Sequence, residues 1–215
     1  RFGLSVLPAC LPGHIAPLRL VTQFNGAAFD TAMLAVVVGT VDANDPTGPD
    51  AYGYYAFDNT DTGYEAAPVY AWIEIDPTRG GNGTSVGLTD YGDGQDDSAT
   101  LSLPFTFRYY GQDFTRVTIC SNGWIAMGST YLTEYRNWTI PGAEAPANMI
   151  APMWDDLYQS GNNKVYRYAD AINHRFIVQW SRMINNNGGG TENFEVILYD
   201  PAYYPTATGD GIVVF

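Results

Sequence analysis

A strictly alternating segment constrains the fold of this chain more than any other feature. Between residues 101 and 109 every second side chain is hydrophobic: Leu101, Leu103, Phe105, Phe107 and Tyr109. Period-two alternation places these side chains on one face of a β-strand. The segment 117–128 follows, with the dipeptide Asn122-Gly123 between apolar residues. Asn-Gly favours tight hairpin turns, whose two central residues take positive φ angles. The two segments therefore predict antiparallel β structure.

Composition agrees with an all-β protein and excludes some functions. The chain has 215 residues, of which 46% are hydrophobic, and its 23 glycines and 13 prolines are typical of many turns. Ten basic and 23 acidic residues give a net charge of −13. We expect no nucleic-acid partner, because phosphate binding needs a basic surface. We also expect no membrane span, because no apolar run is long enough to cross a bilayer.

Three regions follow one another along the chain. Residues 1–40 contain apolar segments at Phe2–Leu7, Ile15–Phe24 and Ala32–Val38, which we interpret as the last strands of an immunoglobulin-like domain. Residues 41–50 have the polar, proline-containing composition of a linker. Residues 51–215 contain a series of short strand-like segments separated by turns, which predicts an antiparallel β-sandwich. These segments include Val69–Ile75, Met149–Trp154, Lys164–Tyr168, Arg175–Ser181, Asn193–Tyr199 and Gly211–Phe215. The chain begins within a strand-like segment, so we expect it to be a piece of a longer secreted polypeptide.

The two cysteines, Cys10 and Cys120, could form one disulfide, and their spacing does not decide whether they pair. We favour two buried free thiols, because free cysteine behaves as a small core hydrophobe. A catalytic cysteine would need a base beside it, and the sequence places neither His14 nor His174 near Cys120. Ser121 lacks the Gly-x-Ser-x-Gly pattern of serine hydrolases. We therefore expect no enzyme activity.

Carboxylates gather in two loop-like regions, and calcium is the cofactor that such clusters can bind. The candidate ligands are Asp45, Asp50, Asp58 and Asp61 in the first region, and Asp90, Asp93, Asp96 and Asp97 in the second. Neither region has the spacing of an EF-hand loop. The alternative is a solvated acidic surface that binds no ion.

Aromatic residues in loop-like stretches are candidates for carbohydrate binding, since their rings can stack on sugar faces. The candidates are Tyr131, Tyr135 and Trp138. The alternative is that these rings belong to the core, because aromatic residues also dominate the interiors of β-sandwiches.

Three pieces of sequence carry a family resemblance. They are VTICSNGWIAMG (117–128), IAPMWDDL (150–157), and FIVQW (176–180) followed by NFEVILY (193–199). In this order they resemble the nidogen-type extracellular β domain. Residues 44–55, 58–62 and 103–111 also resemble domains that follow gingipain-like or subtilisin-like peptidases in bacteria using type IX secretion. The resemblance covers about residues 40–215 and implies an extracellular or cell-surface location. The α/β domain that carries the catalytic dyad of gingipain-like peptidases has no counterpart in this sequence.

We therefore expect a non-catalytic β-sandwich module of a larger secreted or cell-surface protein, acting in adhesion, docking or spacing. A carbohydrate-binding module is one alternative. A structural subunit of an extracellular filament or sheath is another, in which the edge strands Phe2–Leu7 and Gly211–Phe215 pair with neighbouring chains. The expected partners are neighbouring domains of the same polypeptide, glycans or other surface proteins, and further copies of the chain.

Overall fold

The computed structural model describes residues 4–7, 10–25, 27–92, 94–142 and 144–215. Contacts within the chain divide it into two compact units, Arg1–Trp72 and Ile73–Phe215. Residues 51–72, which the sequence pattern assigns to the sandwich, fall in the first unit by this measure. Among the described residues the helical structure is limited to one 3₁₀ turn, η1 (Pro77–Arg79).

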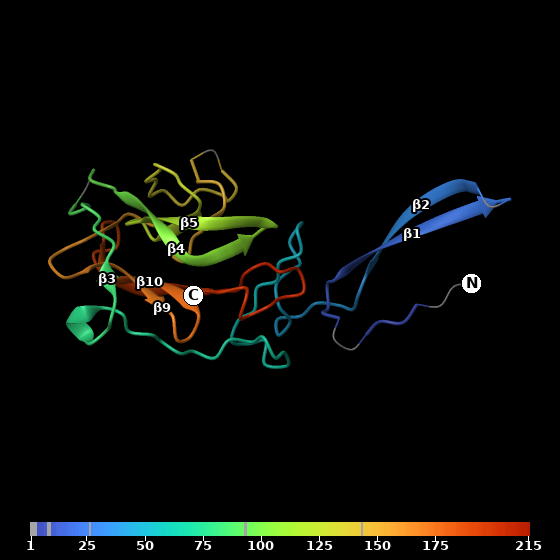
Figure 1. The fold of residues 1–215 in the computed structure, drawn as a ribbon, viewed down its shortest axis with the longest axis horizontal. Helices are drawn as coiled ribbons and strands as arrows, with labels where there is room; N and C mark the ends of the chain where they lie inside the picture. Colours follow the sequence, from blue (N-terminus) through green and yellow to red (C-terminus); the bar gives the residue numbers. More distant parts are fainter. Residues whose placement is uncertain (1–3, 8–9, 26, 93, 143) are drawn as a thin grey trace. The chain divides into compact units, whose positions relative to one another are not determined.

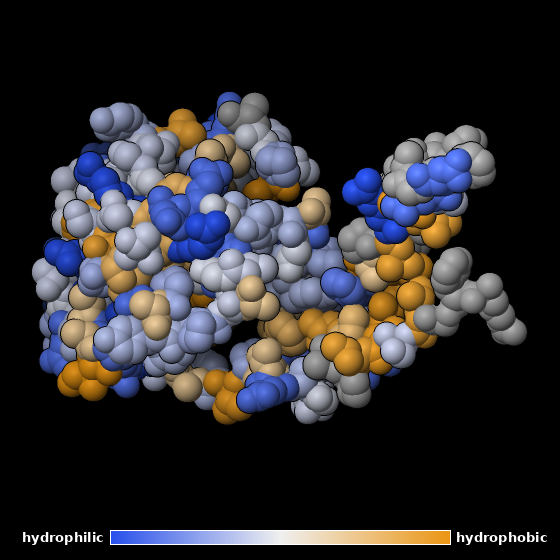
Figure 2. Space-filling view, turned by 45° about the vertical axis from the view of Figure 1, so that its right-hand side comes forward, coloured by the Kyte–Doolittle hydropathy of each residue, from blue (hydrophilic) through white to orange (hydrophobic). Residues whose placement is uncertain are grey.

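The first unit contains one long antiparallel hairpin (Figure 1). Its strands are β1 (Ile15–Phe24) and β2 (Ala27–Val37), so the first strand has the bounds that the sequence predicts. Residues 4–7 form no strand, and the rest of the predicted strand Phe2–Leu7 lies outside the described residues. Ile15 and Val37 are 51% and 62% exposed, and Figure 2 shows hydrophobic residues gathered on this unit. A two-stranded hairpin is marginally stable alone, so this one needs a packing partner.

The second unit contains two antiparallel sheets. One sheet has the strand order β12-β11-β10-β9-β3, with β8 paired to β10, and the other has the order β4-β5-β6-β7. The strands are β3 (Thr84–Ser85), β4 (Ser98–Tyr109), β5 (Gln112–Cys120), β6 (Trp124–Met127), β7 (Met149–Ile150), β8 (Leu157–Tyr158), β9 (Lys164–Asp170), β10 (Arg175–Asn185), β11 (Thr191–Tyr199) and β12 (Val213–Val214). The predicted all-β, antiparallel sandwich is confirmed.

Alternating side chains of both sheets form one shared core. Phe107 of β4 and Ile119 of β5 are fully buried in the same cluster as Phe176 and Trp180 of β10. On β4 the alternation follows the predicted pattern, with residues 103 and 107 buried and residues 102, 104 and 106 exposed. The Trp180 indole N–H donates to the Cys120 carbonyl at 2.9 Å, which links the two sheets. Each such large apolar side chain contributes about 2 kcal/mol on burial.

Two hairpins join the strands of the smaller sheet, and they differ from the expected turn. Tyr109 pairs with Gln112, so the two-residue turn with two positive φ angles (48° and 73°) is Tyr110-Gly111. The Asn-Gly pair instead lies in a three-residue loop, since Cys120 pairs with Trp124. Within this loop Gly123 alone has a positive φ angle (76°). The Asn-Gly pair thus predicts the hairpin correctly and its turn geometry wrongly. The Asn122 side chain instead makes hydrogen bonds to residues outside the turn.

The predicted strand Val69–Ile75 is wrong, because no β-ladder forms there. Instead, Ile73–Asp76, here called the strap, lies on the outer face of the larger sheet. The Ile73 N–H donates to Glu195 Oε1 (3.2 Å), and the Ile75 N–H donates to Gln179 Oε1 (2.9 Å). Side chains of the sheet therefore bond the backbone groups that a neighbouring strand would otherwise bond.

Buried Asp76 fixes the end of the strap. Its Oδ2 atom accepts hydrogen bonds from Ser181 Oγ and from the Arg182 guanidinium, both at 2.7 Å. Burial raises the pKa of Asp76, but the hydrogen bonds from Ser181, Thr78 and Arg182 outweigh it, so the pKa lies below its ordinary value. The strap is therefore held at both ends by side chains of the larger sheet.

The segment Met149–Trp154 forms a shorter strand than the sequence predicts. Only Met149–Ile150 pairs, as β7, and the chain then turns. Trp154 packs with Cys120 and Trp124 in a second cluster on the outer face of the smaller sheet. Both cysteines are free thiols, as predicted, although Cys10 is only partly buried. Burial raises the pKa of the Cys120 thiol, which keeps it protonated and unreactive.

Candidate binding site

A surface hollow of about 320 Å³ lies beside the 129–145 loop, which connects β6 to β7. We call it the loop hollow. Its lining residues are Asp96, Tyr131, Leu132, Thr133, Glu134, Tyr135 and Glu144. Tyr131 is 96% exposed, Leu132 is 42% exposed, and Tyr135 is half-buried. An open, concave surface with exposed rings and carboxylates is suited to binding rather than to core packing.

Buried residues of the sandwich hold the floor of the loop hollow in place. The Asn122 amide Nδ2 donates to Asp96 Oδ1 (2.7 Å) and to the Thr133 carbonyl (2.8 Å). Its Oδ1 accepts from the Leu157 N–H at 2.9 Å. The fully buried Asn122 thus ties three segments together, which explains why a polar residue is tolerated there. The floor is therefore preorganised by the core beneath it.

Arg136 contacts two lining residues of the loop hollow, Glu134 and Tyr135. Glu134 Oε1 accepts from the Arg136 backbone N–H at 2.8 Å, and the guanidinium lies 3.4 Å from the same atom. That guanidinium also lies over the Tyr135 ring, 4.5 Å from its centroid. The Trp138 indole N–H donates to Glu144 Oε2 at 3.1 Å. These contacts orient the aromatic rings at the edge of the hollow.

The structure brings together residues that the sequence suggested for two different purposes. Tyr131 and Tyr135, the candidate carbohydrate contacts, line the same hollow as Asp96, a candidate calcium ligand. Trp138 does not line the hollow, but it contacts the lining residue Glu144. Sequence reasoning did not identify Asn122 as part of the site. The Asn-Gly signal pointed to that position, but only as a turn.

The first group of candidate calcium ligands is engaged in local turns. Asp50 Oδ1 accepts backbone N–H groups from residues 52, 53 and 54 at 2.7–3.0 Å. Asp58 accepts from Thr60, and Asp61 accepts from the Asp58 N–H. Asp45 accepts from the Asp42 N–H and from the Tyr64 hydroxyl. These bonds give each carboxylate a role in turn formation.

The second group of candidate calcium ligands lies near the loop hollow. Asp97 accepts from the Thr89 N–H at 2.7 Å, and Asp90 is buried. Burial raises the pKa of Asp90 to about 6. Asp93 lies outside the described residues. In the part of the chain that the structure describes, no three His, Cys, Asp or Glu side chains gather as a metal site. Calcium therefore stays a prediction for both groups.

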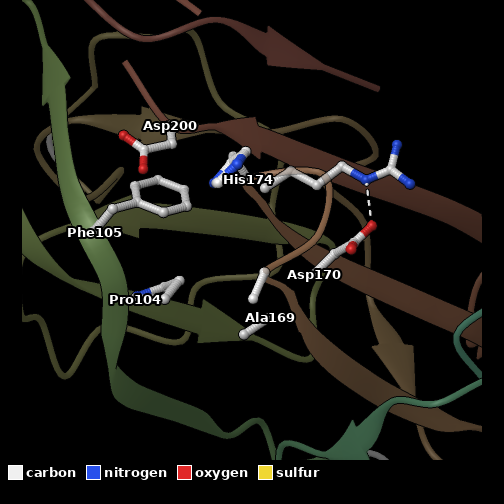
Figure 3. Close-up of a pocket in the computed structure, with 8 residues that line it drawn as sticks. Pro104, Phe105, Ala169, Asp170, His174 and Asp200 are labelled. Atoms are coloured by element: carbon white, nitrogen blue, oxygen red, sulfur yellow. Dashed lines mark hydrogen bonds and ion pairs between the residues drawn. The ribbon is translucent and has the colours of Figure 1, made fainter. Parts of the chain in front are cut away.

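A second hollow, of about 290 Å³, lies where β4 approaches the turn between β9 and β10 (Figure 3). Phe105, Asp200 and His174 lie on one side of it, and the ion pair between Arg175 Nε and Asp170 Oδ2 (2.8 Å) lies on the other. Burial raises the pKa of Asp170, but hydrogen bonds from Asn173 and Arg175 lower it below its ordinary value overall. In the second hollow, Arg175 and Asp170 therefore satisfy each other's charge.

Neither hollow contains the pairing that nucleophilic catalysis requires. The lining of the second hollow includes His174 but no serine, threonine or cysteine. The lining of the loop hollow includes Thr133 but no histidine. Cys120 is fully buried and lines neither of them.

Comparison with known proteins identifies the fold family. The model of the family described as "NIDO related" matches residues 64–202, more than half of the chain. No curated protein and no solved structure matches the chain. Among the described residues, no helix is long and apolar enough to cross a membrane. The matched region spans the strap, both sheets up to β11 and the loop hollow, so the chain belongs to the NIDO-related family of extracellular-type β modules.

Proposed function

We propose that this chain is a non-catalytic module of a larger extracellular protein and that it attaches that protein to carbohydrate through the loop hollow. The observation that carries the proposal is the position of exposed Tyr131 and half-buried Tyr135 beside the carboxylates of Asp96 and Glu144. Aromatic rings can cover the apolar face of a sugar, while carboxylates accept hydrogen bonds from its hydroxyl groups. Both kinds of group line one open surface.

The rigid floor beneath the rings supports the same proposal. Asn122, Trp124 and Trp154 hold the loop through its Thr133 and Glu134 carbonyls. A preorganised surface loses less conformational entropy when it binds a ligand, so even a shallow hollow can bind measurably. A loop held only by its own residues would lose that advantage.

The edges of the two sheets in the second unit favour a module over a filament subunit. The edge strands β3, β7 and β12 have only two residues each. The long edge strand β4 contains Pro104 and a register shift between Ser102 and Phe107, which interrupt its pairing. Short or interrupted edges oppose the addition of a neighbouring chain. Self-association can be measured by light scattering of the purified chain, where a concentration-dependent polymer would favour the filament.

The exposed β1–β2 hairpin suggests how the module joins its parent protein. Its apolar residues Ile15 and Val37 need cover, and a neighbouring domain of the same polypeptide can supply it. The resemblance of residues 44–55 and 103–111 to domains after secreted peptidases supports a parent peptidase in a bacterium using type IX secretion. The complete gene tests this, because it would encode a peptidase domain upstream.

A glycan array tests the carbohydrate proposal directly. We expect the wild-type chain to bind a defined set of glycans and Tyr131→Ala to weaken that binding by about tenfold, because one stacking contact is lost. Trp138→Ala should weaken it as well, through Glu144. Tyr70→Ala is the matched control, because Tyr70 is 87% exposed and lies outside the hollow. A wild-type chain that binds no glycan, or equal losses in all three variants, would overturn the proposal.

A further inference from the structure

Two buried side-chain oxygen atoms of the sandwich unit have no hydrogen-bond partner among the described residues. They are Asp90 Oδ2 and Gln159 Oε1, and both residues are 1% exposed. The two residues contact each other, because the Gln159 backbone N–H donates to the Asp90 carbonyl at 3.0 Å. The Gln159 amide Nε2 donates to the Leu88 carbonyl at 2.8 Å, which fixes the orientation of the amide. Buried polar atoms without a partner are rare in folded proteins and need an explanation.

The charges around Asp90 favour a positively charged partner for its Oδ2 atom. The Asp90 carboxylate receives hydrogen bonds from Ser121 and from the Gly92 N–H, which are uncharged groups. The charged groups that act on it are the carboxylates of Asp96 and Asp156, and no lysine, arginine or histidine is among them. Buried carboxylates are normally paired with a cation or bound to a metal. The groups gathered here are the Asp90 carboxylate, the Gln159 amide oxygen and two nearby carboxylates. All of them are acceptors or negative charges, so the partner that fits them is a cation.

We propose that a calcium ion binds between Asp90 and Gln159. Asp90 Oδ2 and Gln159 Oε1 are the two side-chain ligands, and main-chain carbonyls and water complete the shell. Asp96 and Asp156 contribute their charges from nearby, since Asn122 and Asn186 each bond only one oxygen of these carboxylates. Asp90 is the one acidic ligand in this set, so the site does not require the three clustered His, Cys, Asp or Glu side chains that are absent among the described residues.

The chemistry of the ligands selects calcium over other metals. All the available ligands are hard oxygen atoms, whereas zinc prefers histidine and cysteine. An irregular loop with an amide ligand suits the flexible six- to eight-fold coordination of calcium better than the strict octahedron of magnesium. Asp96 also lines the loop hollow, so the ion would lie beside the proposed carbohydrate site without depending on it.

Thermal unfolding and terbium luminescence test the site on the full chain. We expect millimolar calcium to raise the Tm and a chelator to lower it, because the ion binds only the folded state. Terbium, which occupies calcium sites, should emit when the neighbouring Tyr91 is excited, and calcium should displace it. Asp90→Asn should abolish both effects. Gln159→Glu, which adds a negative charge at nearly the same shape, should tighten calcium binding by about tenfold or more.

The controls separate this site from a general effect of charge. Asp113→Asn removes an exposed carboxylate on β5 and should leave both signals unchanged. A wild-type Tm that responds to neither calcium nor chelator would overturn the proposal, whatever the glycan array shows. An equal response to magnesium, or terbium emission that persists in Asp90→Asn, would overturn the assignment of calcium to Asp90.

Discussion

Trp124 and Trp154 donate their indole N–H groups to one shared acceptor, the main-chain carbonyl of Glu134, at 3.0 and 2.8 Å. One tryptophan comes from β6 and the other from the turn after β7, and both belong to the cluster on the outer face of the smaller sheet. The shared acceptor couples the packing of this cluster to the position of the 129–145 loop. A change in the cluster should therefore reach the loop hollow.

This coupling predicts non-additive effects of two substitutions. Trp124→Phe or Trp154→Phe alone should lower the free energy of unfolding by about 1–3 kcal/mol, because each buried indole loses packing while the Glu134 carbonyl keeps one donor. The double variant leaves the carbonyl without a donor, so its loss should exceed the sum of the single losses by about 1 kcal/mol. Urea denaturation of the four proteins measures this difference. Additive losses would show that the carbonyl reaches water once one donor is removed.

Gly123 should tolerate no side chain. Its φ angle is 76°, and an added Cβ would collide with the Met153 carbonyl oxygen. We expect Gly123→Ala to cost about 4 kcal/mol or more, or to prevent folding, because backbone rather than a flexible side chain would have to move. Gly161→Ala is the control, since Gly161 also has a positive φ angle (60°) and no atom within 4 Å of an added Cβ. Its cost should be about 1 kcal/mol, from backbone strain alone. Equal losses in the Gly123→Ala and Gly161→Ala variants would show that backbone strain, rather than the collision with Met153, determines the cost.

Glu195 should make the stability of the sandwich depend on pH. Burial raises its pKa to about 7, and the Ile73 N–H and Arg175 only partly oppose this effect. The folded state therefore holds a proton that the unfolded state releases, at pH values between the ordinary pKa of 4.5 and about 7. The contribution of Glu195 to the free energy of unfolding is fully present below that pH range and is lost as the pH rises through it.

The variant Glu195→Gln removes this titration and keeps an oxygen for the Ile73 N–H. We expect it to raise the free energy of unfolding at pH 8 by up to about 3 kcal/mol and to have little effect at pH 4.5. Thermal unfolding across this pH range provides the measurement. Glu192→Gln, on the same strand and less buried, is the control. A gain for Glu195→Gln that is constant with pH would contradict the assignment of the titration to Glu195.

Asn122 should be among the most sensitive polar positions. Its side chain makes three hydrogen bonds, to Asp96, Thr133 and Leu157. Asn122→Ala should lower the free energy of unfolding by about 3 kcal/mol, because it removes all three and leaves buried groups without partners. Hydrogen exchange should also become faster in the 129–145 loop. Asn162→Ala, at an exposed residue of the turn before β9, should change neither quantity. An unchanged exchange rate in the loop would show that Asn122 does not position it.

Local pattern predicts those parts of the fold whose hydrogen bonds are local. The bounds of β1 follow from the sequence because its partner β2 comes next along the chain. The strap has the same alternating pattern as a strand, yet its N–H groups bond to Glu195 and Gln179, more than 100 residues away. No pattern within residues 69–75 indicates that these hydrogen bonds to Glu195 and Gln179 will form. Such a segment can be told from a strand only when its tertiary neighbours are known.

The candidate site, like the fold, can be predicted from the sequence only in part. Exposed tyrosines in a polar loop are visible in the sequence, and Tyr131 and Tyr135 were identified in that way. Their meeting with Asp96 depends on Asn122, which bonds to the loops on both sides. Gln159 gave no signal at all, because a glutamine beside a short strand is ordinary until its burial is known. The sequence therefore shows which chemical groups are available for binding, whereas packing decides which of them come together in one site.

The strap has a mechanical consequence for a module in a tethered polypeptide. The chain enters the sandwich unit at Ile73, so tension applied from the N-terminal side reaches the strap before it reaches any strand of the two sheets. Asp76, with its bonds to Ser181 and Arg182, lies at the end of that path. These contacts form a clamp on the sheet face, and the rate at which they yield under load would set how long the module resists extension.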